Sequence, residues 1–111
     1  MADTPEKKVK RKVVDILKQY GMYYFYPVTG GYGASGVPDI VACYNGWFIG
    51  IEVKADLNKN KPTALQQKNL QAIREQGGVA LVIDANNLDH LSETLEALYA
   101  TNVRVRKRPE E

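Results

Sequence analysis

The dipeptide Asn45-Gly46 constrains the fold of this 111-residue chain more than any other feature. Asparagine followed by glycine readily takes the positive φ angles of a two-residue hairpin turn, and runs of apolar and aromatic residues stand on both sides of it. A two-residue turn pairs Tyr44 with Trp47 and fixes every pair further from the turn. The same register places Asp39 directly opposite Glu52, on one face of the hairpin.

The alternation of side chains then divides the hairpin into two faces. One face is apolar and the other carries charged groups. We expect the apolar face to hold Trp47, Ile49, Ile51 and Val53 with Ile40, Ala42 and Tyr44. We expect the second face to hold Phe48, Gly50, Glu52 and Lys54 with Asp39, Val41 and Cys43.

Two opposed acids destabilise a hairpin unless something compensates their repulsion. A hard divalent cation bound by oxygen ligands would do so, and Lys54 adds a cation on the same face. The alternative is that Asp39 is a turn residue after Pro38, while Glu52 and Lys54 belong to an ordinary solvated face. A bulge or a longer turn would remove the pairing altogether.

Periodicity and capping signals predict the remaining elements of a single α/β domain. Thr4-Pro5 starts a helix that ends at Gly21, and Glu6 lies at the N-terminal end of its apolar stripe, where the helix dipole also favours an acid. The predicted order is α-β-β-β-α-β-α with a possible final strand. A strand over 22–28 and a glycine-rich loop over 29–36 precede the hairpin. After it we expect a helix over 63–76, whose apolar positions are Leu65, Leu70 and Ile73, and a strand over 79–84 that is buried on both faces. A helix over 88–99, an edge strand over 103–105 and a charged tail over 104–111 complete the chain.

Composition excludes some classes of protein and leaves others open. The formal charge of +2 is nearly neutral, so bulk charge does not indicate a nucleic-acid partner. The single cysteine, Cys43, excludes an internal disulfide and is expected to be buried in a strand, whereas His90 is expected on a helix surface. No apolar run approaches the roughly 20 residues of a membrane span and no signal peptide opens the chain, which favours an intracellular location.

Basic residues occur in three groups along the chain. If folding gathers them on one surface, they form a face that attracts phosphates; the alternative is three separately solvated runs. The groups are Lys7, Lys8, Lys10, Arg11 and Lys12, then Lys54, Lys59, Lys61 and Lys68, then Arg104, Arg106, Lys107 and Arg108.

Pro38-Asp39 followed by Glu52-Val53-Lys54 resembles the PD-(D/E)xK nuclease motif. The surrounding residues narrow this resemblance to the virus-type replication-repair nuclease (VRR-Nuc) family, whose small stand-alone phage members resemble Holliday-junction resolvases. The resemblance covers about residues 4–84 and implies a restriction-endonuclease-like core, a mixed sheet flanked by helices, in one domain with a core of about 4–100. The segments that carry it are Gly33-Ala-Ser-Gly-Val-Pro-Asp39, Phe48-Ile-Gly-Ile-Glu-Val-Lys54, Pro62-Thr-Ala-Leu-Gln66 and Gly77-Gly-Val-Ala-Leu-Val-Ile83.

The resemblance also implies a role for individual residues. Asp39, Glu52 and the Val53 carbonyl would bind Mg²⁺, for which Mn²⁺ can substitute, and Lys54 would hold or activate the attacking water. Glu6 would support the metal site, and Gln66 would position Lys54 or a phosphate, with its neighbour Gln67 facing solvent. Ser35, Lys59 and Lys61 are candidate DNA contacts. The arginine that the family often carries in the glycine-rich loop is replaced by Tyr32 and Ala34.

The expected function is therefore a Mg²⁺-dependent, structure-selective endonuclease that cuts branched DNA as a homodimer, since a symmetric junction needs two cuts related by a two-fold axis. Several aromatic residues could form part of a dimer face or of the core. They are Tyr23, Tyr24, Tyr26, Trp47 and Phe48. The alternatives are a catalytically silent nucleic-acid-binding module, a flap or splayed-arm nuclease, and a restriction-type nuclease, for which a chain of this size leaves little room.

Overall fold

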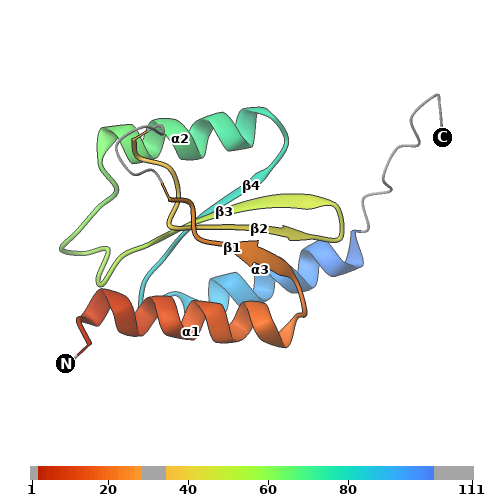
Figure 1. The fold of residues 1–111 in the computed structure, drawn as a ribbon, viewed down its shortest axis with the longest axis horizontal. Coiled ribbons are helices and arrows are strands. Elements are labelled where there is room, and N and C mark those ends of the chain that lie inside the picture. Colours follow the sequence, from red (N-terminus) through yellow and green to blue (C-terminus); the bar gives the residue numbers. More distant parts are fainter. Residues whose placement is uncertain (1–2, 29–34, 102–111) are drawn as a thin grey trace.

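A four-stranded mixed sheet separates two layers of helices in the computed structural model, which describes residues 3–28 and 35–101. Helices α1 and α3 cover one face of the sheet and α2 lies on the other (Figure 1). The observed order confirms the predicted α-β-β-β-α-β-α, while the predicted strand over 103–105 and the charged tail lie outside the described residues. The elements are α1 (Pro5–Gln19), β1 (Tyr23–Phe25), β2 (Ile40–Tyr44), β3 (Trp47–Val53), α2 (Ala64–Glu75), β4 (Val79–Ile83) and α3 (Leu88–Ala100).

The hairpin has the predicted turn and register. Asn45 and Gly46 have φ angles of 51° and 84°, and Tyr44 pairs with Trp47 in an antiparallel ladder that continues to Ile40 and Ile51. The strands are ordered β1-β2-β3-β4, with β3 and β4 parallel and the other pairs antiparallel. Strand β1 is shorter than predicted, with Pro27 just beyond its end, a residue that has no amide hydrogen for a ladder.

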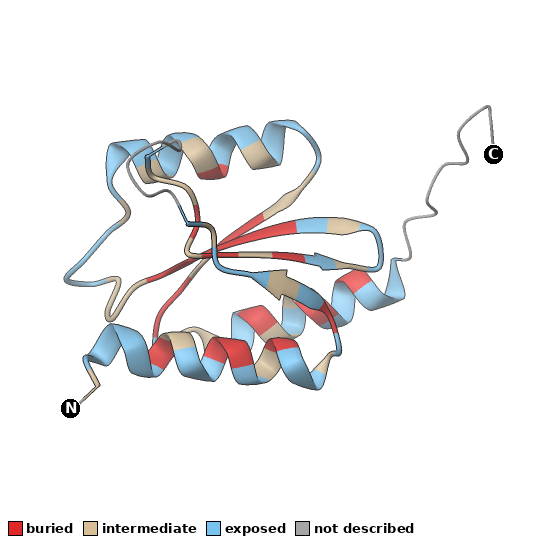
Figure 2. Cartoon of the chain, in the orientation of Figure 1, coloured by how far each residue is buried: buried red, intermediate tan, exposed pale blue. Residues whose placement is uncertain are grey.

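The main core lies between the sheet and the helices α1 and α3. Thr4 caps α1 by accepting a hydrogen bond from the Lys7 amide, which starts the helix at the predicted place. Figure 2 shows buried residues along the sides of α1 and α3 that face the sheet. The predicted apolar face of the hairpin is confirmed. The core includes Val9, Val13, Leu17, Ile40, Ala42, Ile49, Ile51, Val53, Leu81, Ile83, Leu91 and Leu95.

Helix α2 covers only part of the opposite face. A Cβ atom on Gly50 would come within 2.6 Å of Ile73 Cδ1 and 2.9 Å of Pro38 Cγ, so the glycine lets the helix and the Pro38 segment approach β3 closely. Leu70 is buried at 3% exposure and Ile73 is half-buried. The prediction for Leu65 is wrong, since it is 45% exposed and lies against Gly36 at the first turn of α2 instead of in the core.

The rest of this face is exposed, which makes the prediction of a buried Cys43 wrong. The alternation of β2 places Cys43 on the side where α2 does not reach, beside the exposed Tyr23, Phe25 and Phe48. His90 is exposed on α3 as predicted. Strand β4 is covered on both faces. It is an edge strand of the sheet, however, and its Val79 and Val82 side chains are only half-buried. Across the described parts of the chain, no helix is long and apolar enough to cross a membrane.

Candidate active site

The hairpin brings Asp39, Glu52 and Lys54 together at the carboxyl end of β3. The Asp39 Oδ2 atom accepts a hydrogen bond of 2.8 Å from the Val53 amide, so the acid reaches across to the neighbouring strand. Lys54 Nζ lies 3.5 Å from Glu52 Oε2. The juxtaposition that the turn predicted is therefore confirmed, and it rests on a register set by a turn six residues away from each acid.

Glu52 is buried, at 2% exposure, although it is an acid. Its Oε2 atom accepts a hydrogen bond of 2.7 Å from Gln66 Nε2 and faces the Lys54 amine. Its Oε1 atom is buried too and has no hydrogen-bond partner among the described residues. A buried polar atom without a partner costs about 1–3 kcal/mol of folding free energy, and more if it is charged. This oxygen is therefore still able to accept a hydrogen bond or to bind a cation.

Burial and neighbouring charges raise the pKa of Glu52 to about 7. Burial is the largest cause, the negative charge of Asp39 adds to it, and Lys54 acts in the opposite direction. Glu6 also raises this pKa, so its carboxylate lies near enough for its charge to be felt at Glu52. Glu6 is nonetheless exposed in the first turn of α1, so it lies on the solvent side of these acids.

The Val53 carbonyl is oriented toward the side where Asp39 lies. In a strand, the N–H and C=O groups of one residue point toward the same neighbour, and the Val53 N–H points at Asp39. The next amide, that of Lys54, donates to the Ile83 carbonyl on the opposite side, as alternation requires. The predicted ligands Asp39, Glu52 and Val53 therefore present oxygen atoms at the same end of the hairpin.

This set of oxygen donors fits a hard cation that keeps several waters. Mg²⁺ is commonly held by one or two carboxylates, and Glu52 Oε1 supplies an oxygen to which none of the described residues is bonded. Within residues 3–28 and 35–101, no cluster of three or more His, Cys, Asp or Glu side chains is gathered as a metal cage. The protein's share of a metal site here would be two carboxylates and a carbonyl.

Gln66 belongs both to a helix cap and to the site. Its backbone amide donates to Thr63 Oγ1, and its Oε1 accepts from the Thr63 amide at 2.9 Å, which completes a capping box. This arrangement directs Nε2 toward Glu52. Gln66 therefore holds Glu52, whereas one of its expected roles was to position Lys54. Gln67 is exposed as predicted and donates to the Pro62 carbonyl.

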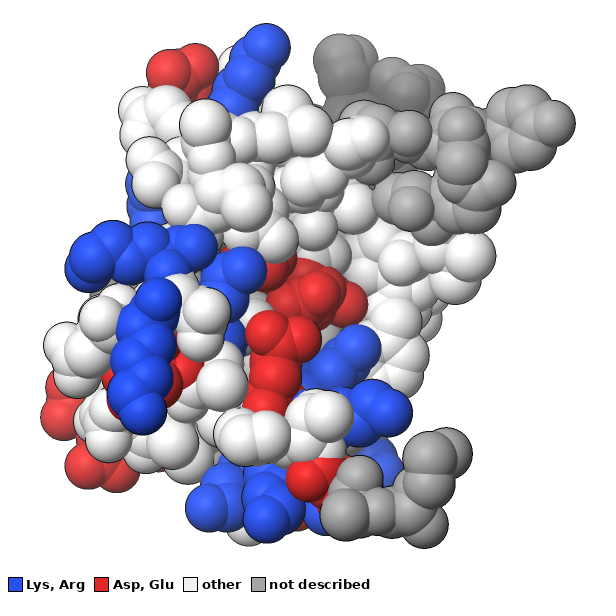
Figure 3. Space-filling model, turned by 90° about the vertical axis from the view of Figure 1, so that its left-hand side faces the viewer, with Lys and Arg blue, Asp and Glu red and all other residues white. Residues whose placement is uncertain are grey.

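The candidate DNA contacts form no hydrogen bond or ion pair with Asp39 or Glu52 in the described part of the chain. Ser35 is exposed, with its carbonyl bonded to Asn69 Nδ2, and Lys59 and Lys61 are exposed in the loop that follows β3. Figure 3 shows Asp and Glu side chains at the centre of this end of the molecule, with Lys and Arg side chains on both sides. Tyr32, Ala34 and the basic group over 104–108 lie outside the described residues.

Sequence reasoning missed a second buried carboxylate, Asp84, which directly follows β4. It is 2% exposed, and both of its oxygens are bonded: Oδ2 accepts from the Leu57 amide, and Oδ1 accepts from the amides of Asn86 and Asn87. Burial acts to raise its pKa, but these hydrogen bonds outweigh it and the pKa is lowered. The available signal was Asp84-Ala-Asn-Asn87 at the end of an apolar strand, a pattern typical of a side-chain-capped turn.

Comparison of the chain with protein-family models, with curated proteins and with solved structures finds no match. The chemistry of the site therefore follows from its own residues. A carboxylate with a pKa of about 7, a second acid and an amine 3.5 Å away can together bind a cation and transfer or orient a proton.

Proposed function

We propose that this chain is a Mg²⁺-dependent nuclease that hydrolyses phosphodiester bonds of branched DNA as a homodimer. The observation that carries the proposal is the buried Glu52, whose Oε1 has no partner among the described residues while Asp39 and Lys54 lie beside it. A fold keeps a buried acid with an unbonded oxygen at a cost, and such groups gather at functional sites. The resemblance of these residues to the PD-(D/E)xK motif supports the same reading, and the restriction-endonuclease-like core belongs to this proposal.

Asp39, Glu52 and the Val53 carbonyl would hold the metal. When bound, Mg²⁺ lowers the pKa of a water and neutralises charge on the phosphate oxygens. Lys54 keeps its amine next to Glu52, where it can orient the attacking water or donate to a phosphate oxygen. Gln66 fixes the Glu52 carboxylate, and Glu6 adds negative charge at the solvent side.

The charge distribution supports DNA as the substrate. Lys and Arg side chains flank the acidic centre on both sides (Figure 3), so a phosphate backbone can be held on either side of the bond to be cut. Lys7 and Lys8 of α1 and Lys59 and Lys61 of the loop after β3 are exposed and are candidates for such contacts. A four-way junction has two-fold symmetry, and a dimer with one site per subunit matches it.

The test is cleavage of four-way junctions, flaps, splayed arms and linear duplex in Mg²⁺ by the wild type, Glu52→Gln and Glu75→Gln. Glu75 is exposed in the last turn of α2, so its variant controls for the loss of one acid. We expect the wild type and Glu75→Gln to cut junctions, and Glu52→Gln to be slower by at least about 10³-fold, as loss of a principal electrostatic group entails. The mass in solution should be that of a dimer.

Metal binding has a second readout that does not depend on cleavage. Mg²⁺ at ten times its dissociation constant should raise the free energy of unfolding of the wild type by about 1.4 kcal/mol and leave Glu52→Gln unchanged. DNA binding without cleavage by either protein would overturn the enzyme and favour a silent binding module. A monomer that cuts only flaps would overturn the junction substrate and leave the nuclease in place.

A further inference from the structure

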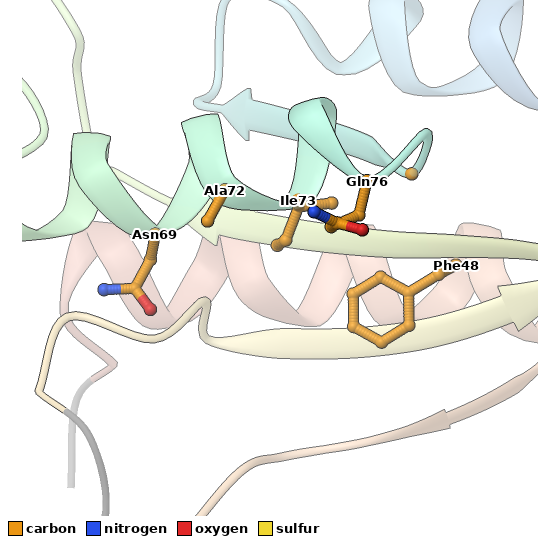
Figure 4. Close-up of a pocket in the computed structure, with 6 residues that line it drawn as sticks. Phe48, Asn69, Ala72, Ile73 and Gln76 are labelled. Carbon is orange, nitrogen blue, oxygen red and sulfur yellow. The ribbon is translucent and has the colours of Figure 1, made fainter.

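A hollow of about 360 Å³ lies between β3 and α2, away from the acids. Phe48, which is 48% exposed, forms one wall of it, and Ala72 and Ile73 form the apolar part of the opposite wall. Figure 4 shows the Phe48 ring and the α2 side chains projecting into the same space. The remaining lining residues are Asn69, Gln76 and Gly78, so no charged side chain from residues 3–28 or 35–101 lines the hollow.

The two amides give this apolar hollow a hydrogen-bonding rim. Asn69 Nδ2 is already used, since it donates to the Ser35 carbonyl at 3.0 Å and to the Leu65 carbonyl at 2.9 Å. Its Oδ1 atom is turned toward the Phe48 side of the hollow (Figure 4). The side chain therefore has its orientation fixed and offers an acceptor, while Gln76 at the other end offers both a donor and an acceptor.

A second hollow of about 440 Å³ adjoins the first, because both are lined by Asn69 and Ala72. It extends along α2 to Leu65 and carries the exposed Lys68. Leu65 is the neighbour of Gln66, which is bonded to Glu52. The two hollows thus follow one another along α2, from Phe48 past a cation to the first turn of the helix, where Gln66 is bonded to Glu52.

We propose that the Phe48 hollow binds an unpaired nucleobase of the DNA, stacked on the Phe48 ring, with the phosphates that follow it near Lys68. The inference rests on the proposed function and adds to it a base, unpaired at the branch of the DNA, that is held next to the cut. Phe48 and Glu52 are four residues apart on one strand, which is about 13 Å and the length of about four stacked nucleotides.

The chemistry of the walls selects this occupant. An aromatic ring, apolar methyl groups, the fixed amide of Asn69 and the amide of Gln76 suit a flat, uncharged ring with hydrogen-bonding edges. Proteins bind unstacked bases in this way. The cation stands in the adjoining hollow, where the charged phosphates would lie. A second copy of the chain would instead use the whole exposed sheet face, on which Tyr23 is 70% exposed and lines neither hollow.

The test uses Phe48→Leu, which keeps an apolar side chain and removes the ring, with Tyr23→Leu as the matched control. Both are made in the full chain and, to prevent cleavage, also in the Glu52→Gln background. The probe is a splayed-arm DNA with 5-iodouracil at successive positions of one arm, irradiated in the complex. Crosslinked peptides are identified by mass spectrometry, and affinity is measured for splayed-arm and fully paired DNA.

We expect a crosslink on the peptide with Phe48 at one or two arm positions. Phe48→Leu should lose it and bind splayed-arm DNA about tenfold more weakly, with fully paired DNA unaffected, whereas Tyr23→Leu should resemble its parent. Crosslinks elsewhere with equal affinity for all variants would overturn the base site. A dimer that both leucine variants convert to monomer would also overturn it, since the face would then be a contact between copies.

Failure of the two proposals can be told apart. If the wild type cuts DNA and the crosslink does not form on Phe48, the base site is wrong and the nuclease stands. If the crosslink forms and no DNA is cut in Mg²⁺, the nuclease is wrong and the base site stands. The crosslink and the affinity need no turnover, so neither result depends on the other.

Discussion

Glu52 and Asp84 are buried to the same extent, at 2% exposure, near the ends of the adjacent parallel strands β3 and β4. Their surroundings differ in one respect. Asp84 accepts three backbone hydrogen bonds, so both of its oxygens are partnered. Glu52 receives a hydrogen bond at Oε2 alone and keeps Oε1 without a partner among the residues described.

The pKa values move in opposite directions as a result. Burial raises the pKa of Glu52 to about 7, while the backbone hydrogen bonds of Asp84 overcome the same effect and lower its pKa. Burial alone therefore does not mark a functional carboxylate. Unused hydrogen-bonding capacity does, because a fold that needed only structure would have filled it.

Asp84 has a structural task that explains its hydrogen bonds. Through the Leu57 amide it ties the loop after Lys54 to the start of α3, and Asn87 reinforces this turn by donating to the Val82 carbonyl. The two carboxylates thus divide the work at this end of the sheet. One holds the loop in place, and the other keeps oxygen atoms available beside Asp39 and Lys54.

The largest expected effect comes from the same chemical change, carboxylate to amide, at both positions. At pH 8 in a chelator, Asp84→Asn should lower the free energy of unfolding by about 3 kcal/mol, because an amide nitrogen cannot accept from backbone N–H groups. Glu52→Gln should raise it by about 3 kcal/mol, since each pKa unit above the ordinary 4.5 is worth about 1.36 kcal/mol. Urea unfolding measures both.

The effects on cleavage should be the opposite of those on stability: Glu52→Gln, the more stable variant, should lose cleavage, and Asp84→Asn, the less stable one, should keep it. Per folded molecule, Asp84→Asn should cut within about threefold of the wild type, and the exposed Asp15→Asn should change stability by no more than about 0.5 kcal/mol. If Asp84→Asn lost as much cleavage activity as Glu52→Gln, Asp84 would take part in catalysis, and the difference in role between the two carboxylates would be wrong.

The pH dependence of stability gives the next largest effect. The folded protein holds the Glu52 proton more tightly than the unfolded chain, so this stabilisation is complete below about pH 4.5 and is lost as pH rises through about 7. In a chelator, we expect the wild type to lose about 2–3 kcal/mol between pH 5 and pH 8, measured by urea unfolding at each pH.

The control for the pH profile is Glu52→Gln, which should be flat over this range. Asp84 behaves oppositely: its lowered pKa gives stability above the unfolded value of 3.8, which is lost as pH falls below it, outside the range measured. Wild-type stability that rises from pH 5 to pH 8 would show that Glu52 is compensated in the metal-free protein.

The smallest expected effect is at Gln66, compared with its exposed neighbour Gln67. Gln66→Ala should slow cleavage about tenfold and cost about 1 kcal/mol of stability, because it removes both the Glu52 hydrogen bond and the capping box. Gln67→Ala should change cleavage less than twofold. Single-turnover cleavage and urea unfolding measure the two effects; equal results for the two variants would remove Gln66 from the site.

Local chemistry made part of this molecule predictable from sequence. The hairpin register follows from Asn45-Gly46 alone, since a two-residue turn leaves one pairing, and the register then brings Asp39 to Glu52. The start of α1 follows from Thr4-Pro5 because capping is also local: the cap bonds to a residue only three positions further along the chain. Lys54 shares a face with Glu52 because side chains alternate along a strand.

Contacts between distant segments decided the rest. The exposure of Cys43 and Leu65 depends on how far α2 reaches across the sheet, which no local pattern specifies. Glu52 Oε1 has no partner in the described part of the chain, whereas Asp84 has a full set, and both outcomes likewise depend on which loop packs against each strand end. The sequence by itself determined which groups face one another across the hairpin, because turn geometry and alternation are local. Only the tertiary structure decided which of those groups are buried and which of their hydrogen bonds are filled, because burial and pairing depend on segments that meet only in the folded chain.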